Sequence, residues 1–345
     1  MHYQVAQATG GRDCIIYFTK KSTNDSFLEN FKKSACQIKD ISKWTDNKWL
    51  YFLNLIYRGI ITGYINRQEQ TPIVFNGQCN FGYKISPWVK KNIRQIELIH
   101  SFNSFSFIRN PFLPFIETTV MISKKRIEDH IQFYDKIKAP VQFMEKIRYV
   151  QNAVDLPVQE VPKDFRDFRV LYVGRGGKEK RVHLVAAIAD KVHEKDPTIK
   201  FEILGDVSEV LNKQEWPLIH FYGDITDEKK ISEIYKNASV LLLTSITEGF
   251  PMVVMEAMAH GCAVIATAVG DIPHHLKENV NGFLFSSIEN EEKIVSEGAQ
   301  EILKLKNDHE LLNSICKNNS QYAQNNFSIE QFNQAYRHIF ETGKK

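Results

Sequence analysis

Short apolar runs alternate with longer amphipathic stretches along the whole chain, which is the pattern of strand–helix–strand units built around parallel sheets. We expect an α/β protein with five strands in each half. The expected strands are residues 14–18, 36–38, 73–75, 95–99 and 119–122 in the first half, and 170–173, 201–204, 219–221, 240–243 and 263–267 in the second.

Residues 151–162 separate the two sets of strands and are expected to form a linker. They include Pro157 and Pro162 and lose helical periodicity. A chain of 345 residues also has the length of two domains. We therefore expect an N-terminal domain at 1–155, a second domain at 156–327 and a final helical segment at 328–345, with Ser328 as its N-cap.

Composition narrows the class of protein. Hydrophobic residues make up 43% and charged residues 25%, as in ordinary globular chains. No apolar run reaches the length of a membrane-spanning helix, and the first residues have no signal-peptide core. The five cysteines are scattered without metal-site spacing, so we expect neither a disulfide framework nor a zinc site. A reducing, cytoplasmic location fits these observations.

Charge is divided unevenly along the chain. The net charge is +3, but residues 1–150 hold 22 Lys/Arg against 12 Asp/Glu, whereas residues 151–345 hold 22 against 29. A basic half suits an anionic substrate or an anionic membrane surface, or it is simply a solvated face. No nucleic-acid-binding motif accompanies the charge, so we expect no nucleic acid partner.

The first chemically informative segment follows strand 170–173. It is a glycine turn with four cations, at positions 175, 178, 180 and 181, that leads into a helix. The dinucleotide fingerprint and the P-loop motif both fail here, because Glu179 stands where the former needs glycine and the latter a hydroxyl. Either Arg175 and Lys180 bind an anion at the helix start, or the segment is a solvated basic turn.

The second segment, residues 247–261, follows strand 240–243. Gly249 allows a tight turn and Pro251 suits a first helical turn, so the helix should begin at the carboxyl edge of the sheet, where open α/β sheets bind ligands. Glu248 precedes this helix and Glu256 lies inside it. Eight residues of helix span about 12 Å, beyond the roughly 5 to 9.5 Å between the carboxylates of a glycosidase. The two carboxylates therefore suit two ends of one long ligand.

With these motifs the second half resembles the retaining, nucleotide-sugar-dependent glycosyltransferases of the GT-B fold, in glycosyltransferase family four. V-G-R-x4-K runs from Val173 to Lys180, and E-x7-E runs from Glu248 to Glu256. Other matches, in the same order, are residues 204–206, 221–224, 270–273 and 281–283. The resemblance implies two Rossmann-like domains that face each other across a cleft, with the final helix crossing back onto the N-terminal domain.

The resemblance also implies roles for individual residues. Arg175 and Lys180 would bind the donor diphosphate, Glu248 the transferred sugar, and Glu256 the ribose. The remaining donor-binding positions that it implies are Gly223, Gly249, Phe250, Pro251 and Met252, although a methionine in this helix also fits simple core packing. A leaving diphosphate can be stabilised by two cations and helix amides without a metal, so we expect no metal and no cofactor.

The N-terminal half resembles the family more weakly. His100, at the end of strand 95–99, matches a histidine near the donor sugar, and its alternative is a structural strand-end residue. The family usually opens with a strand and a glycine-rich loop. Here residues 1–8 read as the helix that follows them, with Gly10 and Gly11 at its end. We therefore expect an incomplete N-terminal domain with an unfilled position in its sheet.

A cluster of aromatic residues offers a further surface. The five phenylalanines at positions 102, 105, 107, 112 and 115 lie close in sequence to Arg109 and to the cations at 124–126. This composition fits either contact with a membrane surface or a lipid acceptor, or packing beneath a long loop.

Together these observations predict a metal-independent glycosyltransferase of the hexosyltransferase type. It would move a sugar from a nucleoside diphosphate sugar, UDP rather than GDP, to a glycan or lipid-linked hydroxyl acceptor in cell-envelope polysaccharide or lipopolysaccharide synthesis. It would work in the cytoplasm, with the basic N-terminal half in peripheral contact with the inner face of the membrane. The alternatives are a nucleotide-sugar-binding partner subunit without activity and a sugar-nucleotide epimerase of the same fold.

Overall fold

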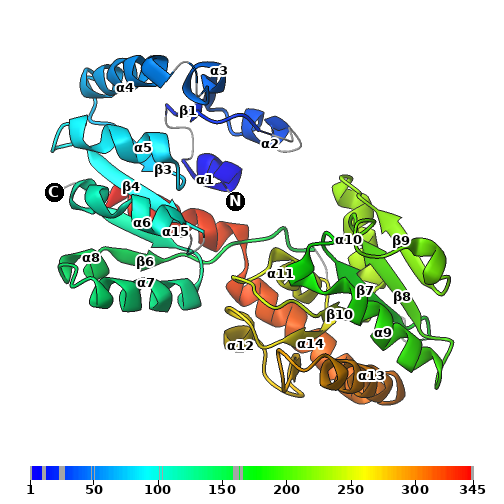
Figure 1. The fold of residues 1–345 in the computed structure, drawn as a ribbon. Helices are drawn as coiled ribbons and strands as arrows, with labels where there is room; N and C mark the ends of the chain where they lie inside the picture. Colours follow the sequence, from blue (N-terminus) through cyan, green and yellow to red (C-terminus); the bar gives the residue numbers. More distant parts are fainter. Residues whose placement is uncertain are drawn as a thin grey trace. The chain divides into compact units, whose positions relative to one another are not determined.

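The computed structural model divides the chain into two compact units (Figure 1). Unit 1 contains Met1–Asn152 and Glu330–Lys345, and unit 2 contains Ala153–Ile329. The structure describes residues 2–9, 13–22, 28–47, 49, 51–100, 102, 104–157, 163 and 166–342. Gly10, Gly11 and residues 158–162 of the expected linker lie outside the described residues.

Unit 2 is built on one six-stranded sheet in which every neighbouring pair of strands is parallel. The order across the sheet is β12-β11-β10-β7-β8-β9. The strands are β7 (Arg169–Val173), β8 (Lys200–Leu204), β9 (Ile219–Gly223), β10 (Val240–Leu243), β11 (Ala263–Thr267) and β12 (Gly282–Phe285). The five strands expected in this half are confirmed, and β12 was not expected from the sequence.

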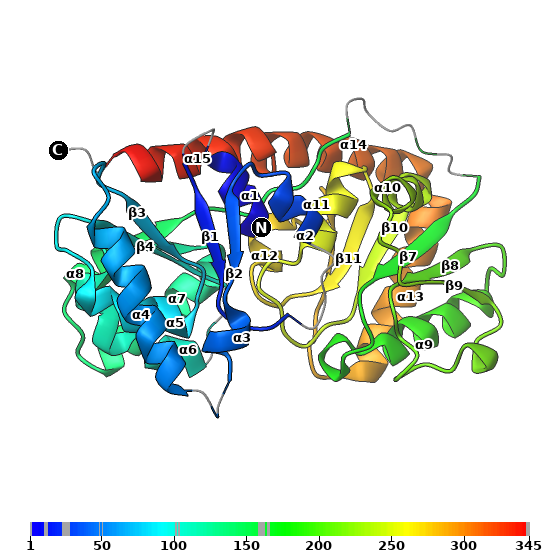
Figure 2. The same ribbon diagram turned by 90° about the horizontal axis from the view of Figure 1, so that it is seen from above.

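Helices cover both faces of this sheet (Figure 2). Helices α9 and α13 pack together on one face, while α11 and α14 pack together on the other. The helices of unit 2 are α9 (Val182–His193), α10 (Glu228–Asn237), α11 (Met252–Ala259), α12 (Ile272–His275), α13 (Glu291–Asn307) and α14 (His309–Asn326). Side-chain caps fix several starts; the Asp227 carboxylate, for example, accepts hydrogen bonds from two main-chain amides at the beginning of α10.

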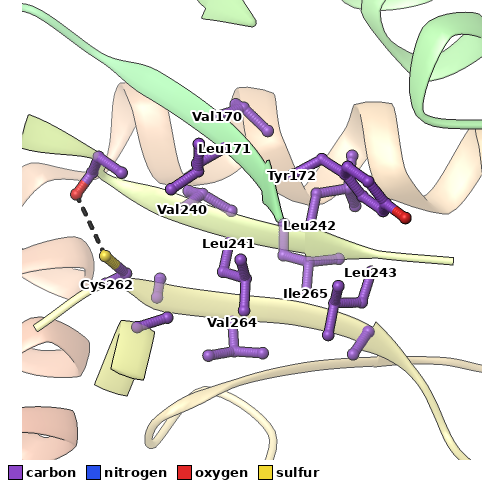
Figure 3. Close-up of a cluster of buried hydrophobic side chains, with 14 of the residues drawn as sticks. Val170, Leu171, Tyr172, Val240, Leu241, Leu242, Leu243, Cys262, Val264 and Ile265 are labelled. Atoms are coloured by element: carbon purple, nitrogen blue, oxygen red, sulfur yellow. Dashed lines mark hydrogen bonds between the residues drawn. The ribbon is translucent and has the colours of Figure 1, made fainter. Parts of the chain in front are cut away.

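The core of unit 2 follows from this double coverage. All four residues of β10 and all five of β11 are buried, because a parallel strand covered on both faces has no solvent side. Figure 3 shows the side chains of β7, β10 and β11 packed between the helices. At one end of this layer the Cys262 thiol donates to the carbonyl oxygens of Tyr235 and Ala238, at 3.3 and 3.4 Å.

Unit 1 is also α/β, but its strands form two separate parallel sheets. The larger sheet has the order β3-β4-β5-β6, and the smaller one contains only β1 and β2. The strands are β1 (Ile15–Phe18), β2 (Gln37–Asp40), β3 (Ile73–Asn76), β4 (Arg94–Ile99), β5 (Thr118–Met121) and β6 (Ile147–Tyr149). Among the described residues no ladder joins β1 to β3, so the two sheets are not one continuous layer.

Short helices surround these sheets, with α4 and α7 the longest before the terminal helix. The helices of unit 1 are α1 (His2–Ala8), α2 (Leu28–Lys32), α3 (Ser42–Thr45), α4 (Tyr51–Asn66), α5 (Asn80–Ile85), α6 (Ser104–Ile108), α7 (Lys124–Lys136), α8 (Gln142–Glu145) and α15 (Ile329–Glu341). The Arg94 side chain fixes the end of α15 by donating to the carbonyl oxygens of Ile339 and Phe340, each at 2.9 Å.

The expectation that the cysteines form no disulfide was wrong at one pair. Cys14 and Cys36 form a disulfide, with their Cα atoms 4.7 Å apart. Parallel pairing of β1 with β2 matches Ile15 with Gln37, which places the two preceding residues opposite each other. Residues 22 positions apart in sequence thus become neighbours through strand register. The other three cysteines are free.

No helix in the described part of the chain is both long and apolar enough to cross a bilayer.

Candidate functional site

The candidate site lies where the strand order of unit 2 reverses. From β7 the chain moves to β8 and β9 on one side, and from β10 it moves to β11 and β12 on the other. Strands β7 and β10 are neighbours, with Val240 paired to Val170. The loops that follow them therefore leave the sheet side by side at its carboxyl edge, where doubly wound sheets bind ligands.

Close backbone packing shapes the loop after β7. Gly205 has φ +120°, and a Cβ atom there would lie 2.2 Å from the Gly174 carbonyl oxygen. The amide of Gly176 donates to the carbonyl of Asp206 at 2.7 Å. Only glycine at position 205 lets the two loops approach this closely. The turn that carries Arg175 is thereby held against the loop after β8.

Two of the expected site residues meet at the junction of the two central loops. The Lys180 ammonium forms an ion pair with Glu248, with Nζ 2.6 Å from Oε1. Lys180 ends a short 3-10 turn before α9, and Glu248 lies in the loop after β10. The ion pair is largely shielded but retains some solvent access. Arg175, in contrast, is exposed and makes no ion pair with any described side chain.

Arg181 is one of the four cations of this turn, but the alternative of a solvated basic turn does not hold for it. Its side chain is buried, donating from Nε to the Thr244 carbonyl at 2.8 Å and from Nη1 to the Ile288 carbonyl at 2.6 Å. The residue has φ +48°, a left-handed conformation that turns the chain into α9. In return, the Thr244 hydroxyl donates to the main chain at Lys180 and Arg181, at 3.0 Å. Arg181 thus links neighbouring loops, and nothing in the sequence indicated its backbone conformation.

The loop after β10 is held from its other side by Gly270. A Cβ atom on this residue, whose φ is +58°, would lie 2.1 Å from the Gly249 carbonyl oxygen and 2.4 Å from that of Glu248. The next amide, on Asp271, donates to the Gly249 carbonyl at 2.7 Å. Gly249 itself, like Gly223 at the end of β9, has open space where a side chain would be. Both expected glycine positions therefore leave room beside the backbone.

Residues 250–252 lead from this loop into α11. The Phe250 ring is buried and stacks on His275, with centroids 4.0 Å apart, so this side chain belongs to the core. Pro251 is the N-cap residue of α11 and lacks a side-chain hydrogen bond to the helix. Met252, the first helical residue, is half-buried against the main core.

Glu256 lies one and a half turns into α11 and faces α10. Its Oε2 accepts a hydrogen bond from the Tyr235 hydroxyl at 2.7 Å. Burial raises the pKa of Glu256, and the nearby carboxylate of Asp155 acts in the same direction. The structure therefore gives Glu248 and Glu256 different partners, a lysine for the first and a tyrosine for the second.

His100 belongs to unit 1, at the end of β4. Its Nε2 lies 2.7 Å from Nε2 of His2, so one ring must donate and the other accept. Desolvation and the neighbouring ring of His2 lower the pKa of His100 to about 3. A neutral imidazole pair is the state that this geometry favours.

Of the two alternatives for the phenylalanines and cations at residues 102–126, a surface and packing beneath a loop, Arg109 follows the second. Arg109 is fully buried and pairs with Glu97, with Nη2 2.5 Å from Oε1. Hydroxyl groups of Tyr83 and Thr119 also donate to this carboxylate. Although burial alone would raise it, the pKa of Glu97 is held below its usual range by the Arg109 guanidinium. Phe107 and Phe115 are exposed, and the side chain of Phe105 lies outside the described part of the structure.

Among the described residues, no group of three or more His, Cys, Asp or Glu side chains is placed to hold a metal ion.

Comparisons with known proteins show which family part of the chain resembles. Residues 158–322 match the family model of the glycosyl transferases group 1. A 41.2 kDa protein of the Klebsiella pneumoniae cps region is 25% identical over 247 residues, which are 71% of this chain and 65% of that protein. The sulfoquinovosyl transferase SQD2 of Arabidopsis thaliana is 30% identical over 122 residues, which are 34% of this chain and 23% of that protein. The chain therefore spans less than two thirds of the length of either relative.

Similarity to solved structures extends over both units. The Anabaena protein HepE in complex with UDP and glucose matches with a TM-score of 0.73 and 16% identity, over 99% of this chain and 95% of that one. The expected fold class, the two Rossmann-like α/β units of GT-B glycosyltransferases, is confirmed.

Proposed function

We propose that this chain transfers a sugar from a nucleoside diphosphate sugar to a hydroxyl acceptor, with retention of configuration. The transfer would need no metal and no cofactor. The premise is that residues 158–322 belong to the glycosyl transferases group 1. The complex of HepE with UDP and glucose supports UDP as the carrier. The relative from a cps region supports an acceptor in cell-envelope polysaccharide synthesis.

The observation that carries the proposal is the Lys180–Glu248 ion pair at the junction of the loops after β7 and β10. A departing nucleoside diphosphate gains negative charge, and a cation held near it lowers the barrier to departure. Lys180 supplies one such charge, and the exposed guanidinium of Arg175 supplies a second from the same loop. Lysine and arginine are also the side chains that bind phosphate oxygens most strongly.

Glu248 and Glu256 would then divide the donor between them. Glu248, beside Lys180 at the open Gly249, would orient the sugar hydroxyls. Glu256, inside α11, would accept hydrogen bonds from the ribose. Its Tyr235 partner leaves the second carboxylate oxygen for such a bond. A retaining transfer through an oxocarbenium-like state needs this positioning more than it needs a protein nucleophile.

Titration calorimetry with UDP tests the diphosphate assignment. Arg175→Ala and Lys180→Ala should each weaken UDP binding by about 1.5 to 3 kcal/mol, because each removes one charge-assisted contact. Lys178→Ala is the matched control, since Lys178 is an exposed cation of the same loop. Binding should persist in excess EDTA. Equal loss in all three variants would reduce the effect to general basic charge, and no loss in any would reject the site.

A second comparison separates binding from transfer. Glu256→Gln should weaken UDP itself, whereas Glu248→Gln should keep UDP affinity and lower the rate of sugar transfer. NMR of the anomeric proton in the first-formed product would report the configuration. Inversion would reject the retaining mechanism while leaving the donor site in place.

A further inference from the structure

Helix α4 (Tyr51–Asn66) carries an apolar stripe on each of two faces. One stripe, centred on Ile61, packs into a small core with Ile41, Phe81 and Ile85. The other stripe faces solvent and follows helical spacing: Phe52, Leu55, Ile56, Gly59 and Ile60. An apolar stripe along a helix normally packs against another part of a protein or enters an apolar environment.

Two tryptophans extend this exposed stripe beyond the helix. Trp49, just before α4, is 94% exposed, and Trp88, in the turn after α5, is 72% exposed. Trp88 also lines a shallow depression of about 510 Å³ together with Leu55, Arg58, Gly59, Thr62 and Gly63 of α4. We call the exposed stripe with Trp49 and Trp88 the α4 face. It lies within unit 1 and does not include any residue of the candidate donor site.

The sequence around the α4 face holds more positive than negative charge. Residues 47–96 contain seven Lys/Arg and one acidic residue, Glu69. No acidic residue occurs within α4 itself. Lys90 and Lys91 follow Trp88 directly, and the Lys90 amide donates to the Asn66 side chain of α4 at 3.0 Å, which fixes this basic pair beside the helix.

The aromatic cluster near α7 provides the contrast. There Lys125 lies 3.2 Å from Asp129 and 3.6 Å from Glu128, and Arg126 lies 2.7 Å from Asp129. Another cation of that region, Arg109, is buried against Glu97. Lys125 and Arg126 are therefore neutralised locally, whereas Lys90 and Lys91 are exposed and form no ion pair with a described side chain, so they are available to an external anionic surface.

We propose that the α4 face docks this chain onto the surface of an anionic lipid bilayer. Its apolar stripe would enter the headgroup boundary, Trp49 and Trp88 would sit at the level where amphipathic rings are most stable, and the surrounding lysines and arginines would contact lipid phosphates. A two-fold contact between copies of this face is disfavoured, because an isologous interface sets each patch against itself and would oppose cation to cation.

Vesicle co-sedimentation tests the proposal with the full chain. Vesicles of phosphatidylglycerol and phosphatidylcholine at equal weight should bind the parent, and vesicles of phosphatidylcholine alone should bind it at least tenfold more weakly. The combined variant Leu55→Gln, Ile56→Gln, Ile60→Gln should lose at least tenfold in affinity for the anionic vesicles. All three side chains are exposed, so the variant should unfold at the parent temperature.

Matched controls separate the α4 face from general hydrophobicity and charge. Val141→Gln and Leu218→Gln remove equally exposed apolar side chains elsewhere and should leave vesicle binding unchanged. The pair Lys90→Gln, Lys91→Gln should lower binding to anionic vesicles by roughly five- to twentyfold, and added salt should abolish this difference.

Three outcomes would overturn the proposal: no binding of the parent to anionic vesicles, equal binding by the parent and the triple α4 variant, or a lipid-free dimer that the triple variant abolishes. The third would assign the α4 face to a second copy of the chain. UDP binding is measured on the same variants and should not change. Since the vesicle assay does not depend on sugar transfer, its failure is distinguishable from failure of the proposed function.

Discussion

Both units are built from parallel strands and helices, but only in unit 2 do the described strands form one continuous sheet. In unit 2 one six-stranded sheet is covered on both faces, and one large core runs through it. In unit 1 the described strands form two separate sheets, one of four strands and one of two. Loops can be held rigidly only by strands that are themselves fixed. The continuous sheet is therefore the better support for a site that must position a sugar and a diphosphate.

The two units also differ in how deeply their ion pairs are buried. Unit 1 encloses a complete ion pair, Glu97–Arg109, inside its larger sheet, where both side chains are fully buried. Unit 2 places its Lys180–Glu248 ion pair at the sheet edge, with some access to solvent. The first pair can only hold structure, whereas an incoming anion can reorganise the second. Burial thus distinguishes a structural ion pair from one that can serve a ligand.

The largest expected difference between the units is in local stability. Strands β1 and β2 form a two-stranded sheet of half-buried and exposed residues, which is marginal alone, whereas β10 is fully buried between two neighbours. Amides of β1 and β2 should therefore open with a free energy about 5 kcal/mol lower than those of β10. Hydrogen exchange followed by mass spectrometry measures this directly. Equal protection of the three strands would remove the contrast.

The next effect concerns the buried ion pair of unit 1. Arg109→Met should lower the free energy of unfolding by about 3 to 5 kcal/mol, because it leaves Glu97 buried without its cation. Replacing Glu97 by Gln in the same chain should recover part of this loss. Lys125→Met, which breaks a surface ion pair, should cost less than about 1 kcal/mol. Urea unfolding followed by tryptophan fluorescence suits this test, since Trp44, Trp49 and Trp88 all belong to unit 1.

In unit 2 the substitution Gly270→Ala tests how rigidly the loop after β10 is held. The substitution forces a left-handed backbone on alanine and places its Cβ against two carbonyl oxygens, so we expect a loss of about 3 kcal/mol in stability together with weaker UDP binding. Gly249→Ala is the control for stability alone, because open space surrounds that position and the residue itself belongs to the expected donor site. Calorimetric unfolding would measure both. Similar melting of the two variants would show that the loop tolerates displacement.

The smallest effect depends on pH and belongs to unit 1. His130 is buried, with Nδ1 2.7 Å from the Arg126 carbonyl oxygen and Nε2 3.2 Å from the Ser106 hydroxyl. Burial lowers its pKa to about 4; Arg109 acts in the same direction, while the Arg126 carbonyl, Glu97 and Asp129 oppose it.

Below about pH 6.5 His130 therefore binds a proton in the unfolded chain, whereas in the folded chain it binds one only near pH 4. The free energy of unfolding falls across that interval. Between pH 7 and pH 5 the parent should lose about 2 kcal/mol more than His130→Gln. His183→Gln, at an exposed position, is the control. Parallel pH profiles for the parent and His130→Gln would contradict a neutral buried ring.

The strands and the motif positions were accessible from sequence because each rests on local pattern. Val240–Leu243 is a run of four apolar residues, and its short length favours a buried strand over a helix. β6 and β12 were missed because neither contains four apolar residues in a row: β6 has three residues with Arg148 at its centre, and β12 begins with Gly282. The approach of Lys180 to Glu248 follows from adjacent strands, which the motifs themselves imply.

Other features depend on register or solvent exposure and leave no local signal. The Cys14–Cys36 disulfide exists because β1 pairs with β2 in one particular register. Arg109 looks like a surface cation until Glu97 is placed beside it. In α4 the stripe that faces solvent is as apolar as the one that faces the core, so periodicity alone could not separate them.

The Arg181 side chain has a consequence for how this site can change over generations. One guanidinium holds the carbonyl of Thr244 after β10 and that of Ile288 after β12, while its own backbone ends the loop after β7. One residue therefore holds together three loops from distant parts of the sequence. A single loop taken from a relative would lose these contacts with the other two loops. Changing the specificity of this site therefore requires that all three loops be exchanged together.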